Sequence, residues 1–163
     1  MNRVITSACL ALVLCVSVAH AGPYDQWQHR KGDFQAVLIE YGHDSWCDWA
    51  RFSVLTMMSY EASKNEGRRR GWTSGQINAL RHALWQYQLT HAYGDDVARA
   101  IGNQQEQYSA DPNDSAIDQY NNLQARILYR KNQKTGIPLD MAIRFLVRSI
   151  DRETGGFITR PSP

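Results

Sequence analysis

The sequence predicts an all-α protein, a compact bundle of about five to six helices. Apolar residues recur at spacings of three and four over most of the chain, which is the period of a helix buried on one side. Gly94 and the run Gly136-Ile137-Pro138 interrupt this pattern at points where helices should end. Only residues 156–159 have a composition typical of a strand, so we expect helices to pack on helices.

The individual helices follow from this periodicity and from residues that can cap them. Three positions offer a side-chain oxygen to the first backbone N–H groups of a helix: Asp44 or Ser45, Thr73 or Ser74, and Asn113 or Asp114. We expect helices over residues 33–41, 45–64, 74–93, 95–109, 114–132 and 139–151. The basic run at residues 68–70 is expected to be a solvated loop between two of them.

The N-terminus has the features of a secretory signal peptide. Arg3 precedes an apolar run over residues 8–18, and Ala19-His20-Ala21 forms a small-x-small cleavage site before Gly22. The run is shorter than the roughly 18 residues that span a bilayer, so we expect no membrane span after the signal is removed. The expected organisation is a signal peptide at 1–21 and a single helical domain at 22–163, in the periplasm or secreted.

The net charge limits the classes of partner that we expect, and the cysteine content limits the disulfides. The net charge is +2, which is too balanced to favour a nucleic-acid partner, so we expect an unknown substrate or a protein partner instead. No sequence motif names a cofactor. Cys9 and Cys15 leave with the signal, so Cys47 cannot form an intramolecular disulfide and is expected to be buried as a small hydrophobe.

The segment 74–93 should be the central helix, because it carries two apolar stripes. One stripe contains Ile77, Leu80, Leu84, Tyr87 and His91, and the other contains Asn78, His82, Trp85, Leu89 and Ala92. Two stripes predict burial on two faces. Asn78 and His82 therefore lie one turn apart on a buried stripe, where polar groups need partners.

The helix from residue 114 supplies candidate partners. We expect its core face to consist of Ile117, Tyr120, Leu123, Ile127 and Leu128. Asp118 and Asn121 border this face one turn apart, whereas Asn122 points further round and is expected at a solvated edge. Glu106, on the preceding helix, is a further carboxylate that can approach His82.

These polar residues resemble a family pattern. The segments are Asn78-x-x-Arg81-His82-Ala83, Gly94, Ala98, Gly102-x-x-x-Glu106 and Asp118-x-x-Asn121-Asn122. They resemble a helical domain of unknown function that occurs at the C-terminal ends of bacterial polymorphic toxins and in small exported proteins. The resemblance implies a hydrolytic role. The chain departs from the family pattern at Gln105 and Tyr120, where histidine is common, and at Ala125, where glycine is common.

The residues themselves support an acid–base site. His82 beside Asp118 or Glu106 would be a base oriented by a carboxylate, and Asn78 and Asn121 would donate hydrogen bonds to developing negative charge. Binding roles are assigned to Arg81, Asn122 and Trp85. One histidine falls short of the ligands zinc prefers, so no metal site is assigned, although an oxygen-rich Mg or Ca site stays open.

Two other functions compete with a hydrolase of this kind. Cys47 in the first turn of its helix, paired with His43 or His82, would be an amidase or peptidase centre. A non-catalytic periplasmic binding or inhibitor module, in which the polar network only specifies the packing, is the main alternative. The sequence leaves enzyme status open, with the hydrolase ahead.

Overall fold

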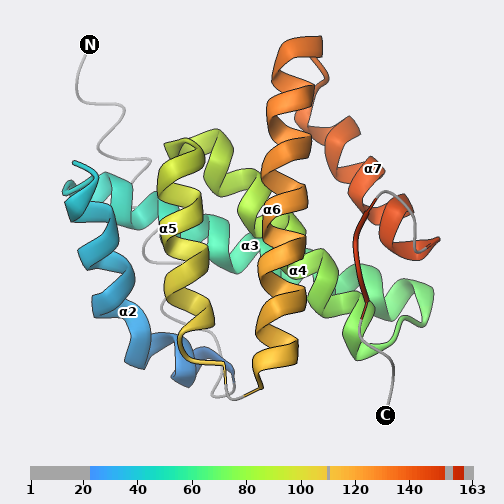
Figure 1. Ribbon diagram of the computed structural model, residues 1–163, viewed down its shortest axis with the longest axis horizontal. Helices are drawn as coiled ribbons and strands as arrows, with labels where there is room; N and C mark the ends of the chain where they lie inside the picture. The colour runs from blue at the N-terminus through green and yellow to red at the C-terminus, as the bar shows by residue number, and fades with distance from the viewer. Residues whose placement is uncertain (1–22, 110, 153–155, 160–163) are drawn as a thin grey trace. The chain divides into compact units, whose positions relative to one another are not determined.

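The computed structural model describes residues 23–109, 111–152 and 156–159, with side chains described from residue 30 onward. Its helices are α2 (Pro23–Glu40), α3 (Trp46–Arg70), α4 (Ser74–Tyr93), α5 (Asp95–Glu106), α6 (Pro112–Thr135) and α7 (Leu139–Asp151) (Figure 1). No strand occurs among the described residues, and 156–159 are irregular, so the all-α prediction is confirmed. The expected signal peptide lies outside the described residues.

The chain forms two units, one ending at Val54 and one beginning at Leu55. In the first unit, α2 contacts the beginning of α3 through the rings of Phe34 and Phe52, whose centroids are 5.5 Å apart. The second unit contains the rest of α3 and all of α4 to α7. None of the described helices combines the length and apolarity that a membrane crossing requires.

Local sequence signals set most helix ends. Thr73 caps α4 through a reciprocal pair of hydrogen bonds with Gln76, and the helix ends at Gly94, where φ is +91°. α6 begins earlier than expected, because the Asp111 side chain accepts from the backbone N–H of Asn113 and Pro112 occupies the first helical position. Gly136 ends α6 in the left-handed conformation.

Two expected boundaries were wrong by more than one turn, and there are smaller differences at the end of α5, at Glu106, and at the end of α6, at Thr135. α2 begins at Pro23 and not at Asp33. α3 continues to Arg70, so the basic run is the last helical turn and not a loop. Positive charge suits a helix C-terminus, and Arg69 and Arg70 both donate to Glu66 one turn earlier. Arg70 also pairs with Asp151 at the end of α7, at 2.9 Å.

The core of the second unit surrounds α4, as predicted. α4 packs against α5, α6 and α7. The apolar core on its α7 side contains Ala79, Leu80, Ala83, Leu84, Tyr87, Ala142, Leu146, Val147, Ile150 and Phe157. Residues 82–90 of α4 are all buried, so the helix is enclosed on two faces and its polar residues on the α6 side must find partners there.

The orientation of α6 contradicts the predicted core face at three of its residues, whereas half-buried Leu128 packs against the core as expected. Tyr120, Leu123 and Ile127 are 39–41% exposed. The buried face of α6 instead carries Ser115, Asp118, Asn121, Asn122, Ala125, Arg126 and Asn132. α6 therefore turns its polar side toward α4, because the polar side chains of α4 supply the hydrogen bonds that offset the cost of burying them.

Candidate functional site

Three side-chain pairs join α4 to α6. Asn78 Nδ2 donates to Asp118 Oδ1 at 2.8 Å, His82 Nδ1 lies 3.1 Å from Asn122 Oδ1, and Arg126 donates to Gln86 Oε1 at 3.1 Å. Each pair is separated by 40 residues, so the two helices run parallel and in register over two turns. We call the pairs Asn78–Asp118, His82–Asn122 and Gln86–Arg126 the polar ladder.

α5 lies along the polar ladder in the opposite direction. Its last residue, Glu106, faces His82, while its first residue, Asp95, faces Arg126 with 3.6 Å between Oδ1 and Nε. Between them, Gly102 lies against the side chains of Gln86 and Asn122. A Cβ atom on Gly102 would lie 2.8 Å from Gln86 Nε2, so only glycine allows this close approach without displacing the amide.

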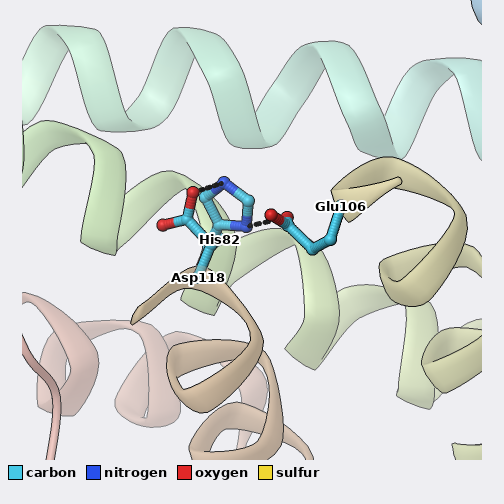
Figure 2. A group of neighbouring side chains, drawn as sticks. All are labelled: His82, Glu106 and Asp118. Atoms are coloured by element: carbon cyan, nitrogen blue, oxygen red, sulfur yellow. Dashed lines mark ion pairs between the residues drawn. The ribbon is translucent and has the colours of Figure 1, made fainter. Parts of the chain in front are cut away.

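The centre of the site is the imidazole of His82, which lies between two carboxylates (Figure 2). Nε2 is 3.3 Å from Asp118 Oδ2, and Nδ1 is 3.9 Å from Glu106 Oε1. The three residues come from α4, α5 and α6 and are only 4%, 8% and 6% exposed for His82, Glu106 and Asp118 respectively. At this burial their mutual electrostatic interactions are stronger than at a wet surface.

This arrangement suits proton transfer. A carboxylate at one imidazole nitrogen orients the ring and stabilises its protonated form, which is what a general base requires. The same three residues offer ligand atoms that lie within 4.8 Å of one another, a spacing that a divalent cation can draw together. Because the carboxylates lie at opposite nitrogens, a cation on one nitrogen would require one carboxylate to turn.

Arg81 and Trp85, expected to bind a ligand, lie beside the polar ladder. Arg81 donates to Asn78 Oδ1, and Asn78 in turn donates to Asp118, so this guanidinium reinforces the orientation of the carboxylate. The Trp85 ring meets the His82 ring edge-on with 6.5 Å between centroids, and its Nε1 donates to Thr56 at 3.0 Å. Trp85 is therefore an apolar wall of the site.

The structure does not place Asn121 with this cluster. Asn121 Nδ2 donates to the carbonyl of Ile158 at 2.8 Å, and its Oδ1 accepts from the backbone N–H of Ile158 at 2.9 Å. Both ends of the carboxamide are thus used to fix the C-terminal segment, whose Phe157 is buried in the core. A step of 100° per residue turns Asn121 away from His82.

Asn122 takes the position that we had expected for Asn121. It is buried, not at a solvated edge, and contacts His82 directly. Gln86 and Arg126 were not predicted at all, although each continues a row of polar residues at four-residue spacing, and this spacing was the signal available. Burial lowers the pKa of Arg126, while the charge of Asp95 opposes that shift.

The upstream cysteine is not a buried hydrophobe. Cys47 is exposed, which overturns the expectation of burial. The reason is its place in the first turn of α3, before the helix begins to bury its apolar face at Phe52. His43, its proposed partner, has Nδ1 3.7 Å from Asp48 Oδ1.

The fold and the site together define a small helical domain built around a buried histidine between two carboxylates. The chain belongs to the family described as a domain of unknown function, DUF6973, whose model matches residues 48–154. No curated protein and no solved structure matches the chain in the other two comparisons.

Proposed function

We propose that this protein is an exported hydrolase in which His82 is the general base for a water molecule. One observation carries the proposal: the imidazole is held between Asp118 and Glu106 in the interior of the second unit. A buried base that is oriented by one carboxylate and approached by another is the arrangement that activates water.

The roles follow from the distances. Asp118 accepts the Nε2 proton of His82, which leaves the lone pair on Nδ1. Glu106 Oε1, at 3.9 Å from Nδ1, is too far for a direct hydrogen bond, so a water molecule can contact both atoms. Asn122 Oδ1 lies 3.1 Å from Nδ1, so this carboxamide must move aside before the water molecule can donate to that nitrogen.

The family resemblance supports hydrolysis, and its departures at Gln105, Tyr120 and Ala125 are not among the three residues of the cluster. Tyr120 is on the exposed face of α6, and Gln105 is only half-buried. The chain therefore keeps His82, Glu106 and Asp118 as a complete set.

Export rests on the N-terminal residues alone. The basic residue, apolar run and small-x-small site predict cleavage between Ala21 and Gly22. Protein recovered from the periplasm or medium of an expressing bacterium should begin at Gly22 by N-terminal sequencing. Recovery of a chain that retains Met1 would contradict export.

Activity is tested with chromogenic substrates of three classes: a p-nitrophenyl ester, a p-nitroanilide and a bis(p-nitrophenyl) phosphodiester. The wild-type protein should hydrolyse one class, and His82→Gln should lose roughly 100-fold or more in kcat/KM. His91→Gln is the matched control, because His91 is on the same helix and exposed. Equal rates for His82→Gln and wild type would overturn the proposal.

The second candidate is a binding or inhibitor module, and the near-complete burial of the three residues favours it. In that case the polar ladder only specifies how α4, α5 and α6 pack. Asp118→Asn separates the two functions, since the amide keeps the shape of the carboxylate. A catalytic Asp118 predicts a folded variant without turnover, whereas a structural Asp118 predicts reduced stability with no separable loss of function.

A further inference from the structure

Two amide nitrogens in the polar ladder lack an acceptor. Gln86 Nε2 and Asn122 Nδ2 make no hydrogen bond, although Gln86 is 0% and Asn122 is 2% exposed. Buried donors are normally paired, because an unpaired one loses its hydration without replacement. Both nitrogens approach the same point, since they lie 2.8 and 3.3 Å from the position of a Cβ atom on Gly102.

The oxygen ends of the two carboxamides differ in how firmly they are held. Gln86 Oε1 accepts from Arg126, and a guanidinium can only donate, so Gln86 cannot turn without losing this bond. Asn122 Oδ1 lies against His82 Nδ1, and an imidazole nitrogen can either donate or accept. Asn122 is therefore the group that can rotate.

A half-turn of the Asn122 carboxamide would give both amide nitrogens a partner. Its Nδ2 would donate to an unprotonated Nδ1 of His82, and its Oδ1 would turn toward Gln86 Nε2. The hydrogen bonds would then run in one direction, from Arg126 through Gln86, Asn122 and His82 to Asp118. From the other end, Arg81 and Asn78 already donate toward the same carboxylate.

We propose that Gln86 and Asn122 are positioning residues that hold His82 as the neutral tautomer with its proton on Nε2. The charged groups that face this imidazole are Glu106 from α5 and Asp118 from α6. We call the chain of hydrogen bonds from Arg126 to Asp118 the relay. Arg126 fixes the orientation of the Gln86 carboxamide, and Gln86 fixes that of Asn122. Asn122 then donates to Nδ1 of His82 and keeps this nitrogen unprotonated. The inference deepens the proposed function, on which its catalytic meaning rests, because Nδ1 must be unprotonated to receive a proton when water takes the place of the Asn122 N–H2 group beside it.

The test is the ¹⁵N NMR spectrum of histidine-labelled protein at about pH 8, above the ordinary histidine pKa near 6.5. Wild-type His82 should show a pyridine-type Nδ1 and a protonated, pyrrole-type Nε2. The exposed His91 in the same sample is the internal reference for an imidazole outside the polar ladder. A protonated Nδ1 in wild-type His82 would overturn the inference.

Gln86→Glu provides the sharper test, because within the polar ladder the hydrogen-bonded route from position 86 to His82 passes through Asn122. A carboxylate at position 86 keeps the pair with Arg126 but accepts from the Asn122 N–H2 group, which turns Asn122 Oδ1 toward His82. Nδ1 of His82 should then become protonated. An unchanged His82 spectrum in folded Gln86→Glu protein would refute the relay.

Asn122→Leu and Leu123→Gln complete the design. Asn122→Leu removes the contact at Nδ1 but leaves Asp118 at Nε2, so the tautomer protonated on Nδ1 should appear as a minor population that wild type lacks. Adding Gln86→Glu to this variant should have no further effect on the spectrum. Leu123→Gln is the matched control, since Leu123 follows Asn122 on α6 but is 40% exposed, and it should leave His82 as in wild type. If Gln86→Glu fails to fold, the Asn122→Leu spectrum decides, because retention of the single tautomer would refute the proposal. None of these spectra requires catalytic turnover. They can therefore contradict the relay without contradicting the proposed hydrolase activity, and a lack of activity would not contradict the relay.

Discussion

Asn78 Nδ2 donates to Asp118 Oδ1 at 2.8 Å across the interface of α4 and α6. The pair is the first of three that share the same separation of 40 residues. Because this register brings polar residues of both helices together, hydrogen bonds hold the part of the interface beside His82, while Ala125, Leu128 and Tyr129 of α6 add apolar packing. The consequences for stability and reactivity can be measured pair by pair.

His82 and Asp118 should be energetically coupled. In a double-mutant cycle, the unfolding free energies of His82→Ala and Asp118→Ala should be non-additive by roughly 0.5 to 3 kcal/mol, as for other residues in one polar network. Urea denaturation of the four proteins measures this term. A cycle of His82→Ala with Asp140→Ala is the control and should be additive, since exposed Asp140 pairs with Arg144 on α7. Additivity in the first cycle would contradict the network.

Gly102 should not tolerate a side chain. Gly102→Ala would place a Cβ atom 2.8 Å from Gln86 Nε2, so we expect a loss of about 1 to 3 kcal/mol of unfolding free energy from overpacking. Gly32→Ala is the control within another helix, because nothing lies within 4 Å of its Cβ position. There, the better helix propensity of alanine should stabilise by up to about 1 kcal/mol. Equal effects at both positions would argue against close approach at Gly102.

Substitutions on the exposed apolar face of α6 should change the unfolding free energy little, whereas substitutions on its buried face should lower it. Leu123→Gln should change the unfolding free energy by no more than about 0.5 kcal/mol, because Leu123 is 40% exposed. Ala125→Val, two residues further, should cost about 1 to 3 kcal/mol, because Ala125 is fully buried in the core. Denaturation midpoints of the two variants measure this contrast, and a larger loss for Leu123→Gln would restore the predicted apolar core face.

Cys47 should react in the native state. Its exposure predicts that a disulfide reagent such as DTNB labels it without denaturant, and that Cys47→Ser removes this fast labelling. The substitution should alter stability by no more than about 0.5 kcal/mol, since an exposed hydroxyl replaces an exposed thiol. Labelling that appears only on unfolding would show that the thiol is buried.

Glu66 should stabilise α3 at neutral pH and lose that effect in acid. Burial opposes its ionisation, but hydrogen bonds from Arg70 and Arg69 outweigh this and hold its pKa below the ordinary value of 4.5. A carboxylate with a lowered pKa contributes stability above its unfolded pKa, and this contribution is lost as the pH falls through the lower, folded value. Because the group is partly exposed, we expect no more than about 1 kcal/mol. Comparing wild type with Glu66→Gln by urea denaturation between neutral and acidic pH should show a difference that shrinks as the pH falls below 4.5 and disappears below the lowered, folded pKa; a constant difference would contradict this.

The sequence by itself determined the helical architecture. Caps, glycine stops and apolar periodicity act within about one turn of the chain, so the bounds of α4 and α7 could be predicted from neighbouring residues alone. The buried position of α4 followed from its two stripes. The sequence also identified four polar residues that need hydrogen-bond partners: Asn78, His82, Glu106 and Asp118. This need follows from burial alone and does not depend on which neighbours are present.

Only the tertiary structure decided which residues meet. The sequence placed the apolar side of α6 inward, but α4 presents Asn78, His82 and Gln86 to it, and pairing these groups outweighs burying Leu123. That choice rotates α6 so that Asn122 contacts His82 and Asn121 contacts the C-terminal backbone. A helix sequence fixes the angle of about 100° between successive side chains, whereas the direction in which each side chain points depends on the surface offered by the partner helix.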